Sequence, residues 1–291
     1  MTKTYLNMYQ MIKKYNLKNI KHVNDIQVYL QYPEYNFVYN KLWLSSIQNI
    51  NSAPMGIYPN NYPIIFKPII NLFGMSKGVK VIKNDKEYDL NMKDGFFWMD
   101  YISGDHYCID MIIVNGNIKF NSCLKSFSYI NGSFKYHESL PNFKIPIKVS
   151  KWIKYYLNDY TGVLNLELLN GIIIDVHLRL NGDFQLYDKK FIISLDNFFK
   201  YKKWDLNYNI KKKFLIPFFV NKDITKNDIK LLKLHLENLC KDNKYVNSIM
   251  YENVNSEYQS EYASRLFMID VNDLNEGLKI KQLLSYSNFI I

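Results

Sequence analysis

The sequence predicts an α+β protein in which antiparallel strand pairs are combined with amphipathic helices. Two apolar runs are interrupted by Asn-Gly, at 115–116 and at 170–171, and this dipeptide favours the tight turn of a two-residue β-hairpin. A third observation is the order strand, helix, strand, strand, helix after Trp204, which indicates a small α+β unit. The 291 residues are 48% hydrophobic, which is enough for one large domain or two ordinary ones.

Each further element is predicted from its local pattern. Helices are expected where apolar residues recur three or four positions apart, and loops where Gly, Asn, Ser and Pro gather. Thr225 is expected to cap a helix, with Asp228 three residues on. The predicted elements are helical pieces within 3–31, a helix over 40–50, strands over 62–70 and 79–82 around a loop over 71–79, a strand over 96–102, hairpins over 106–120 and 164–183, a helix over 149–160, a loop over 136–141, a strand over 214–220, a helix over 225–239, strands over 248–252 and 265–271, and a helix over 274–284.

Charge and cysteine usage narrow the functional class. The net charge of +10 comes from lysines spread along the chain, as at 200–203 and 211–213, whereas a nucleic-acid-binding protein usually concentrates its basic residues. A solvated lysine-rich surface is therefore favoured over a nucleic-acid partner. The cysteines Cys108, Cys123 and Cys240 match neither a zinc pattern nor a disulfide framework. Without an apolar leader or a run long enough to span a membrane, the sequence predicts a cytoplasmic protein with no membrane partner.

The run LNLELLNGIIIDVHLRLNGD (164–183) places charged side chains in an apolar hairpin. Glu167 before the turn and Asp175 after it are eight positions apart, and we expect the two acids to face each other across neighbouring strands. Like charges side by side are unfavourable unless a cation lies between them. Two carboxylates beside His177 and Arg179 suit Mg²⁺ that holds a polyphosphate. An amphipathic hairpin whose acids face water is the alternative.

A lysine interrupts the apolar strand in YPIIFKPIINLFGMSKGVKVI (62–82). Lys67 comes from a buried strand, so its charge needs an anionic partner such as a phosphate. The loop from Gly74 to Gly78 offers backbone N–H groups to further phosphates, because glycine allows a close approach. A plain strand-turn-strand hairpin is the alternative interpretation.

Two further segments complete a pattern. YNKLWLSSIQNINSAPMGIYP (39–59) combines a lysine, a helix and a Pro-bearing loop, and FFWMDYISGDHYCID (96–110) is an apolar strand followed by polar residues. In order and spacing, the four segments resemble the ATP-grasp superfamily over about residues 39–187. The resemblance implies the ATP-grasp fold, in which two α+β lobes clamp a nucleotide. The implied parts are a short N-terminal helical segment (1–38), the small lobe (39–98), the large lobe with the metal hairpin (99–204) and a small C-terminal α+β extension (205–291).

The resemblance also implies which residues bind ATP. Lys41 matches the lysine that reaches the phosphates, and Lys67 matches the one at the α-phosphate. The main chain of the strand over 96–102 would hold adenine, and the ribose hydroxyls would lie near its end, where this chain has a histidine in place of the usual acid. The implied nucleotide-binding residues are Lys41, Lys67, Gly74, Ser76, Lys77, Gly78, Asp100, Tyr101, Ile102, Asp105 and His106.

The hairpin residues take the metal and catalytic roles in this resemblance. Glu167 and Asp175 would bind Mg²⁺ (or Mn²⁺), although Asp175 is shorter than the usual Glu. His177 replaces the usual Asn and could ligate or donate through one ring nitrogen. Arg179 would stabilise the transferred phosphoryl group. The implied catalytic residues are Arg179, Lys67 and His177.

The reaction that the resemblance implies is carboxylate activation. An ATP- and Mg²⁺-dependent ligase would form an acylphosphate, which an amine then attacks. An ATP-grasp kinase or phosphotransferase and a non-catalytic nucleotide-binding module are the alternatives. ATP and a small carboxylate and amine are the expected partners, and the oligomeric state, a homodimer included, stays open. The candidate substrate residues are Lys125, His137, Glu138 and Asn181, each of which also fits a polar surface.

Overall fold

The structure is a computed structural model, and it describes residues 3–6, 8–20, 24–74, 76–128, 133–182, 186–220, 224–252 and 264–285. Contacts within the chain divide it into two units that each combine distant stretches of sequence. Unit 1 consists of residues 1–21, 122–143 and 182–291, and unit 2 consists of residues 22–121 and 144–181. The four consecutive segments with boundaries after 38, 98 and 204 stay a prediction.

Unit 2 contains the segments on which the predicted site depends. Its helices are α2 (Asp25–Gln31), the 3-10 helix η1 (Pro33–Tyr39), α3 (Lys41–Ser46), α4 (Asp85–Asn91) and α5 (Ile147–Tyr156). Its strands are β2 (Ser52–Pro54), β3 (Ile64–Pro68), β4 (Lys80–Ile82), β5 (Phe96–Asp100), β6 (His106–Val114), β9 (Gly162–Leu169) and β10 (Ile172–His177), with the start of β7 (Asn117–Ser128), which runs on into unit 1.

A four-stranded antiparallel sheet forms one part of unit 2. Its strand order is β2-β5-β3-β4. Ile64 and Phe66 of β3 pack with Trp98 of β5 and Tyr88 of α4 in a buried cluster. Burial of these apolar side chains anchors β3 in the sheet, so that Lys67, the next residue along, is fixed in direction as well as in position. The predicted strands over 62–70, 79–82 and 96–102 are thus confirmed.

Strands β6, β9 and β10 form the second part of unit 2. Strand β9 lies between β6 and β10 and is antiparallel to both. Leu164, Leu166 and Leu168 of β9 are fully buried, as expected for a central strand. Both predicted Asn-Gly turns are present, at 115–116 and at 170–171. Helix α5 confirms the helix predicted over 149–160, with its first residue at Ile147.

Unit 1 is built round a sheet of its own. Its helices are α1 (Met8–Lys14), α6 (Lys189–Tyr201), α7 (Lys226–Cys240) and α8 (Leu274–Ser285), and its strands are β1 (Lys3–Tyr5), β8 (Phe134–Ser139), β11 (Phe214–Val220), β12 (Val246–Tyr251) and β13 (Ser264–Val271), with the end of β7. The strand order is β1-β12-β13-β11-β8-β7, and the pair of β1 and β12 is parallel.

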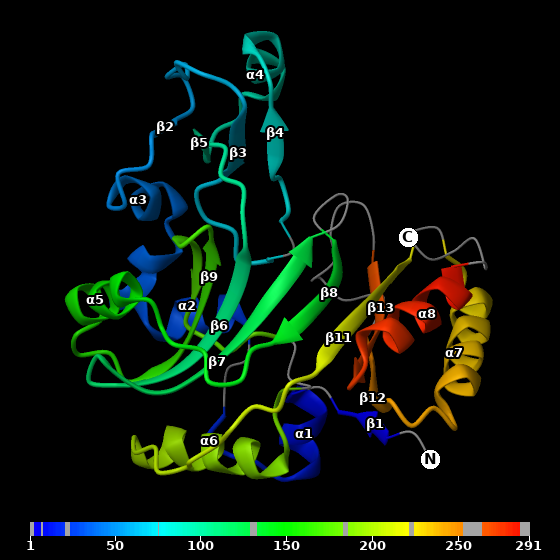
Figure 1. Ribbon diagram of the computed structural model, residues 1–291. Coiled ribbons are helices and arrows are strands. Elements are labelled where there is room, and N and C mark those ends of the chain that lie inside the picture. The colour runs from blue at the N-terminus through cyan, green and yellow to red at the C-terminus, as the bar shows by residue number, and fades with distance from the viewer. Residues whose placement is uncertain are drawn as a thin grey trace. The chain divides into compact units, whose positions relative to one another are not determined.

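Helices α7 and α8 lie side by side next to strands β11, β12 and β13 (Figure 1). Leu232 and Leu236 of α7 and Ile280 of α8 are buried with apolar residues of these strands. The Thr225 side chain accepts from the Asp228 backbone N–H, and the Asp228 carboxylate accepts from the Thr225 backbone N–H, which confirms the predicted cap. The C-terminal α+β part therefore forms, but β11 also pairs with β8, so it shares its sheet with an earlier stretch of the chain.

Several predicted elements of unit 1 were wrong or were missed. The stretch over 136–141 is not a loop, because Phe134–Ser139 forms β8 between β7 and β11. Lys3–Tyr5 forms an edge strand where helical periodicity was expected. Helix α6, and helix α4 in unit 2, were not predicted. Strand β1 pairs with β12, more than 240 residues away, and β8 pairs with the distant β11 as well as with its neighbour β7, so local patterns report these partners only in part.

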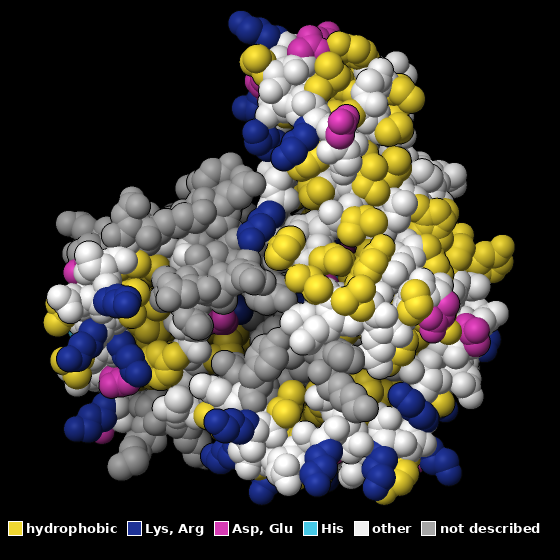
Figure 2. All heavy atoms as spheres, turned by 180° about the vertical axis from the view of Figure 1, so that it is seen from behind, with side chains coloured by type: hydrophobic (Ala, Val, Ile, Leu, Met, Phe, Trp, Pro, Cys, Tyr) yellow, Lys and Arg dark blue, Asp and Glu magenta, His cyan; other side chains and the backbone are white. Residues whose placement is uncertain are grey.

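The surface agrees with a diffuse positive charge. On the face in Figure 2, the lysine and arginine side chains are dispersed over several small groups between apolar and uncharged residues. Cys108, Cys123 and Cys240 form no disulfide with one another. In the part of the chain that the structure describes, no helix is long and apolar enough to cross a membrane.

Candidate nucleotide-binding site

The turn between β9 and β10 has the backbone that its sequence predicts. Asn170 has φ of +51° and Gly171 has φ of +77°, so both central residues are left-handed, as in a type I′ turn. Asn tolerates this conformation and Gly has no Cβ to oppose it. The turn fixes Ile172 opposite Leu169, and the hairpin register follows from that pair.

The two carboxylates of the hairpin face each other because of a β-bulge. Asp175 is the register partner of Glu167, as predicted. A regular two-residue turn would instead place Ile174 opposite Glu167, since the register starts at Ile172 and Leu169. The register shifts between Ile173 and Asp175, which leaves Ile174 as the extra residue. The spacing of eight positions thus brings the acids together only through an irregularity that the sequence did not reveal.

Two lysines from other elements contact the hairpin beside these carboxylates. Lys41, the first residue of α3, forms an ion pair with Asp175. The Lys67 Nζ atom donates to the Ile174 carbonyl at 3.4 Å and lies 5.6 Å from the centre of the Phe97 ring. Lys67 is 8% exposed. Burial and the nearby Lys41 charge lower the pKa of Lys67 to about 8, against the opposing influence of Asp175 and Glu167. The four residues on which the sequence prediction depends therefore lie together.

Glu167 is held as a carboxylate by its neighbours. Burial, the largest single influence, raises its pKa, but His106, whose Nε2 atom lies 3.2 Å from Oε2, opposes this effect. With further help from His177 and Lys41, the pKa of Glu167 falls to about 2. His106, which the resemblance placed near the ribose, is thus a neighbour of the acidic pair in this structure.

Asp25 belongs to the same cluster and was missed in the sequence. It is 1% exposed, and its Oδ1 atom lies 3.0 Å from Nδ1 of His177. Its Oδ2 atom accepts from Nε of Arg179 at 2.8 Å and from Nη2 at 2.7 Å. Burial opposes its ionisation, yet the charges of Arg179 and His177 hold the pKa of Asp25 well below its usual range. No local signal marks this aspartate, because an acid at the start of a helix is common.

The contact with Asp25 fixes the orientation of the His177 imidazole ring. With Nδ1 turned to Asp25, Nε2 is the ring nitrogen that faces the two carboxylates, and it could ligate a metal ion in the neutral tautomer that carries its proton on Nδ1. The Nε2 atom lies 3.6 Å from Oδ1 of Asp175 and 4.0 Å from Oε1 of Glu167. Arg179, by contrast, is turned toward Asp25 and the Leu180 carbonyl, so part of its hydrogen-bonding capacity is already used.

The donors around the acidic pair fit a hard divalent cation in kind. Two carboxylates and an imidazole nitrogen are ligands that Mg²⁺ or Mn²⁺ accepts. In the described ranges, no three His, Cys, Asp or Glu side chains already form a group that could hold a metal ion. The positive charge next to Asp175 is the Lys41 ammonium group. Metal binding would thus require Lys41 to release this carboxylate.

The predicted loop after β3 contains residues with left-handed backbone. Gly74, Ser76 and Gly78 have positive φ of 64°, 51° and 76°. The Lys77 N–H donates to the Gly74 carbonyl at 3.3 Å, and its Nζ atom lies 5.1 Å from the centre of the Phe73 ring. Met75 lies outside the described residues. The phosphate contact of this loop stays a prediction.

The predicted hinge residues follow β5. The Asp100 N–H donates to the Asn51 carbonyl at 2.9 Å, and its side chain accepts from Asn51 at 3.0 Å. Tyr101 is exposed and Ile102 is partly buried. The Asp105 carbonyl accepts from the N–H of Asn170, which ties this segment to the hairpin turn. The adenine and ribose roles stay predictions.

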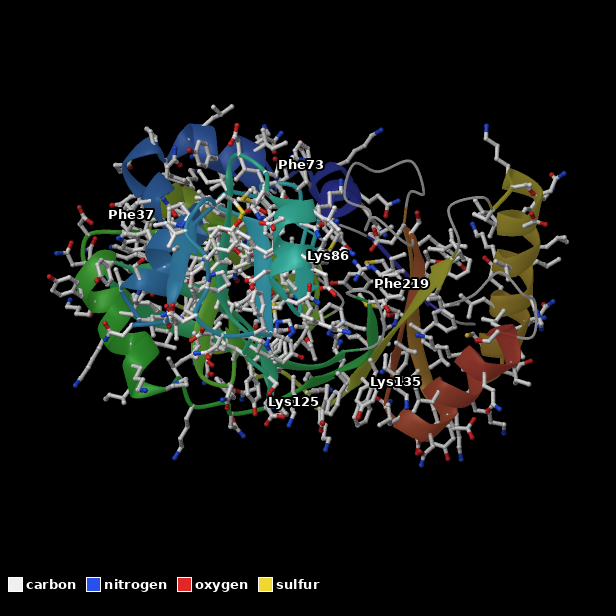
Figure 3. The ribbon with its side chains drawn as sticks, turned by 90° about the horizontal axis from the view of Figure 1, so that it is seen from above. Phe37, Phe73, Lys86, Lys125, Lys135 and Phe219 are labelled. Carbon is white, nitrogen blue, oxygen red and sulfur yellow. The ribbon has the colours of Figure 1, made fainter. Side chains whose placement is uncertain are left out.

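The candidate substrate residues do not form one group. Lys125 on β7 (Figure 3) is the register partner of Glu138 on β8, and Glu138 pairs with Lys212 at 3.0 Å. His137 is buried and lies 2.8 Å from Oγ of Ser126. These residues belong to unit 1, whereas Asn181 belongs to unit 2.

Asn181 is bound by a buried acid of its own unit. Its backbone N–H donates to Asp110 at 2.7 Å, and the same Asp110 oxygen accepts from the Asn165 side chain at 2.8 Å. This bond uses the main chain of Asn181. The substrate roles of all four candidates stay predictions.

The sequence matches no protein-family model and no curated protein. The structure, however, is similar to solved enzymes. An L-amino acid ligase from Bacillus licheniformis is similar with a TM-score of 0.60 at 15% identity, over 88% of this chain and 72% of that one. A carboxyaminoimidazole ribonucleotide synthase from Aspergillus clavatus, complexed with ATP, gives 0.59 at 9% identity, over 86% and 73%.

An N5-carboxyaminoimidazole synthetase from Staphylococcus aureus, complexed with ADP, gives a TM-score of 0.58 at 12% identity, over 85% of this chain and 71% of that one. Identities this low establish the fold and not the substrate. The fold shared with these enzymes is the ATP-grasp fold, so the fold class predicted from the four sequence segments is confirmed.

Proposed function

We propose that this chain, which has the ATP-grasp fold, is an ATP- and Mg²⁺-dependent ligase that activates a carboxylate as an acylphosphate for attack by an amine. The observation that supports it best is the convergence of two lysines on one acidic pair. Lys41 from α3 and Lys67 from β3 meet the hairpin at Asp175 and Ile174. Cations and carboxylates gathered in this way suit a metal-bound polyphosphate.

Lys67 is the strongest single argument for a phosphate ligand. A buried ammonium group is costly unless its donors are satisfied. Among the described residues, the only hydrogen-bond acceptor of Lys67 is the Ile174 carbonyl, at a long 3.4 Å. A phosphate oxygen would supply both the missing acceptor and the missing charge. We therefore assign Lys67 to the nucleotide phosphates, together with Lys41.

Glu167, Asp175 and His177 would hold the divalent cation. When bound, Mg²⁺ neutralises phosphate charge and aligns the phosphate groups. Asp25 keeps the Nε2 atom of His177 directed at the two carboxylates, as shown by the 3.0 Å contact at Nδ1. Lys41 would move from Asp175 to a phosphate, exchanging one anionic partner for another.

The proposed chemistry depends on positioning and charge. The substrate carboxylate attacks the γ-phosphorus, ADP leaves, and the acylphosphate forms. The amine then attacks the acyl carbon, phosphate leaves, and the amine loses a proton as the amide forms. Lys41, Lys67 and Arg179 would stabilise the negative charge of the phosphoryl group in transfer. The similar structure of an L-amino acid ligase supports this reaction class.

The first experiment measures nucleotide binding. We expect calorimetry to detect ADP binding with Mg²⁺ and much weaker binding without it. Lys67→Met should weaken binding at least about tenfold, because a charge-assisted phosphate contact contributes about 1.5–3 kcal/mol. Lys86→Met, on the exposed part of α4 (Figure 3), is the matched control and should bind as the wild type does. A folded wild type that binds no nucleotide would exclude the proposal.

The second experiment separates the ligase from its alternatives. Phosphate release and product mass are measured with ATP, Mg²⁺ and a panel of amino acids and other small carboxylates with amines. An amide formed in step with ADP and phosphate supports the ligase. A phosphorylated product without an amide supports a kinase, and binding without turnover supports a non-catalytic module.

A further inference from the structure

Gln48, just beyond the end of α3, binds the backbone of β10 with both ends of its side-chain amide. Its Oε1 atom accepts from the Ile173 N–H at 2.8 Å, and its Nε2 atom donates to the Ile173 carbonyl at 2.8 Å. The same Nε2 atom donates to the Leu44 carbonyl at 2.9 Å. The amide is therefore held by the carbonyl of Leu44. At the same time it forms with Ile173 the two hydrogen bonds that a residue of an adjacent strand would form.

The contact lies at the point where the hairpin becomes irregular. Strand β10 is the end strand of its sheet, so the outward N–H and C=O groups of Ile173 have no strand to pair with. Ile173 still follows the regular register, opposite Leu168, and Ile174 is the extra residue of the bulge. Gln48 thus holds the last regular residue before the register changes.

The position of the bulge decides which way Asp175 faces. Side chains alternate along a strand, so a shift of one residue exchanges the two faces of the sheet. If the register continued regularly through Ile174, Asp175 would lie opposite Leu166, and its carboxylate would leave the side on which Glu167 lies. We propose that Gln48 is a positioning residue that fixes the bulge and thereby keeps Asp175 beside Glu167 for metal-nucleotide binding, an inference that rests on the proposed function.

Gln48 differs from the other contacts at this place. Lys41 binds Asp175 and Lys67 binds the Ile174 carbonyl, but both are cations that phosphates attract. When nucleotide binds, these two contacts would be exchanged for phosphate contacts. The amide of Gln48 is neutral and its bonds to Ile173 are independent of the ligand. Besides the pairing with β9, it is therefore a contact that can hold β10 in both states.

The test compares Gln48→Leu with Ser46→Ala. Leucine keeps much of the volume and removes both bonds to Ile173, whereas the exposed Ser46 hydroxyl donates to the Leu42 carbonyl of its own helix. We expect Gln48→Leu to weaken MgADP binding at least tenfold in calorimetry. Amide exchange should show the Ile173 N–H losing its protection, with the β9 amides unchanged. Ser46→Ala should match the wild type in both measurements.

A double-mutant cycle decides whether the effect passes through Asp175. Asp175→Asn alone should weaken MgADP binding, and adding Gln48→Leu to it should cause almost no further loss. If the loss of MgADP affinity in the double variant equals the product of the two single losses, the inference is overturned. An unchanged exchange rate of the Ile173 N–H in Gln48→Leu would overturn it as well. If Gln48→Leu does not fold, Gln48→Met, which keeps the unbranched chain, takes its place. If the wild type binds no MgADP, the proposed function fails, and the exchange rate of Ile173 alone decides whether Gln48 holds the bulge.

Discussion

Lys67 shows how one residue combines fold and function. Its neighbours Phe66 and Phe97 are buried apolar residues of β3 and β5, and they bring its ammonium group into the interior of unit 2. The charge is tolerated at a cost, which is visible as a pKa lowered to about 8. Because the ordinary value is higher, the free energy of unfolding rises with pH between the two pKa values. A ligand that restores the charge should therefore take up a proton.

This coupling gives a pH-dependent prediction. At about pH 9, binding of MgADP should take up close to one proton, and the affinity should fall about tenfold per pH unit above the pKa of Lys67. At about pH 7 the uptake should be close to none, because Lys67 is already charged. Calorimetry in buffers of different ionisation enthalpy measures the uptake. Lys67→Arg, which stays charged at both pH values, is the control, and equal uptake in the two proteins would contradict the assignment.

Asp25 shows the limit of prediction from sequence at the residue scale. Its partners His177 and Arg179 are more than 150 positions away, and only the folded chain brings them together. Lys41, Lys67, Glu167 and Asp175 could be predicted because each stands in a segment with its own pattern. Asp25 has no such pattern, and neither does Gln48, whose contact is with backbone atoms that any sequence would present.

At the scale of elements, the hairpin of β9 and β10 supplies both the turn and the acids of the candidate site. Its strands, its turn and the facing acids were predicted from the sequence. The bulge was not, because the extra residue, Ile174, is as apolar as its neighbours. Strand β8 was also missed, because several of its residues are polar and its sequence therefore looks like a loop. Only its pairing with β7 and β11 identifies it as a strand.

The turn itself can be tested by substitution. Gly171→Ala should lower the free energy of unfolding by about 1–2 kcal/mol, because alanine disfavours the left-handed backbone at φ of +77°. Gly182→Ala is the matched control, since neither glycine has an atom within 4 Å of an added Cβ and Gly182 has no positive φ. Denaturant unfolding measures both. Equal effects at the two positions would show that backbone conformation is not the cause.

At the scale of the whole molecule, the residues of the candidate site lie in one of the two units. The acidic pair, both lysines, His177 and Asp25 all belong to unit 2. Unit 1 has its own core under α7 and α8, and there Gly277 lies so close to the strands that an added Cβ would meet Val271 at 2.8 Å and Ile216 at 2.9 Å. Unit 1 can therefore be weakened without changing any residue of the candidate site.

Gly277→Val should lower the free energy of unfolding by about 3 kcal/mol, the upper end for an overpacked core. Lys279→Val, an exposed position of the same helix, should cost less than about 0.5 kcal/mol. Circular dichroism against denaturant measures both changes. Below the unfolding transition, MgADP affinity should stay within about twofold of the wild type, since the substitution leaves the contacts of unit 2 intact. A tenfold loss of affinity would contradict this separation.

The interleaving of the two units along the chain has a consequence for synthesis. Every residue of unit 2 has been made once the ribosome has passed position 181, whereas the sheet of unit 1 still lacks β11, β12 and β13. The first strand of the protein, β1, must wait for β12, which is translated more than 240 residues later. Since domains fold as their segments emerge, unit 2 can mature first, while β1 stays unpaired until β12 has been made.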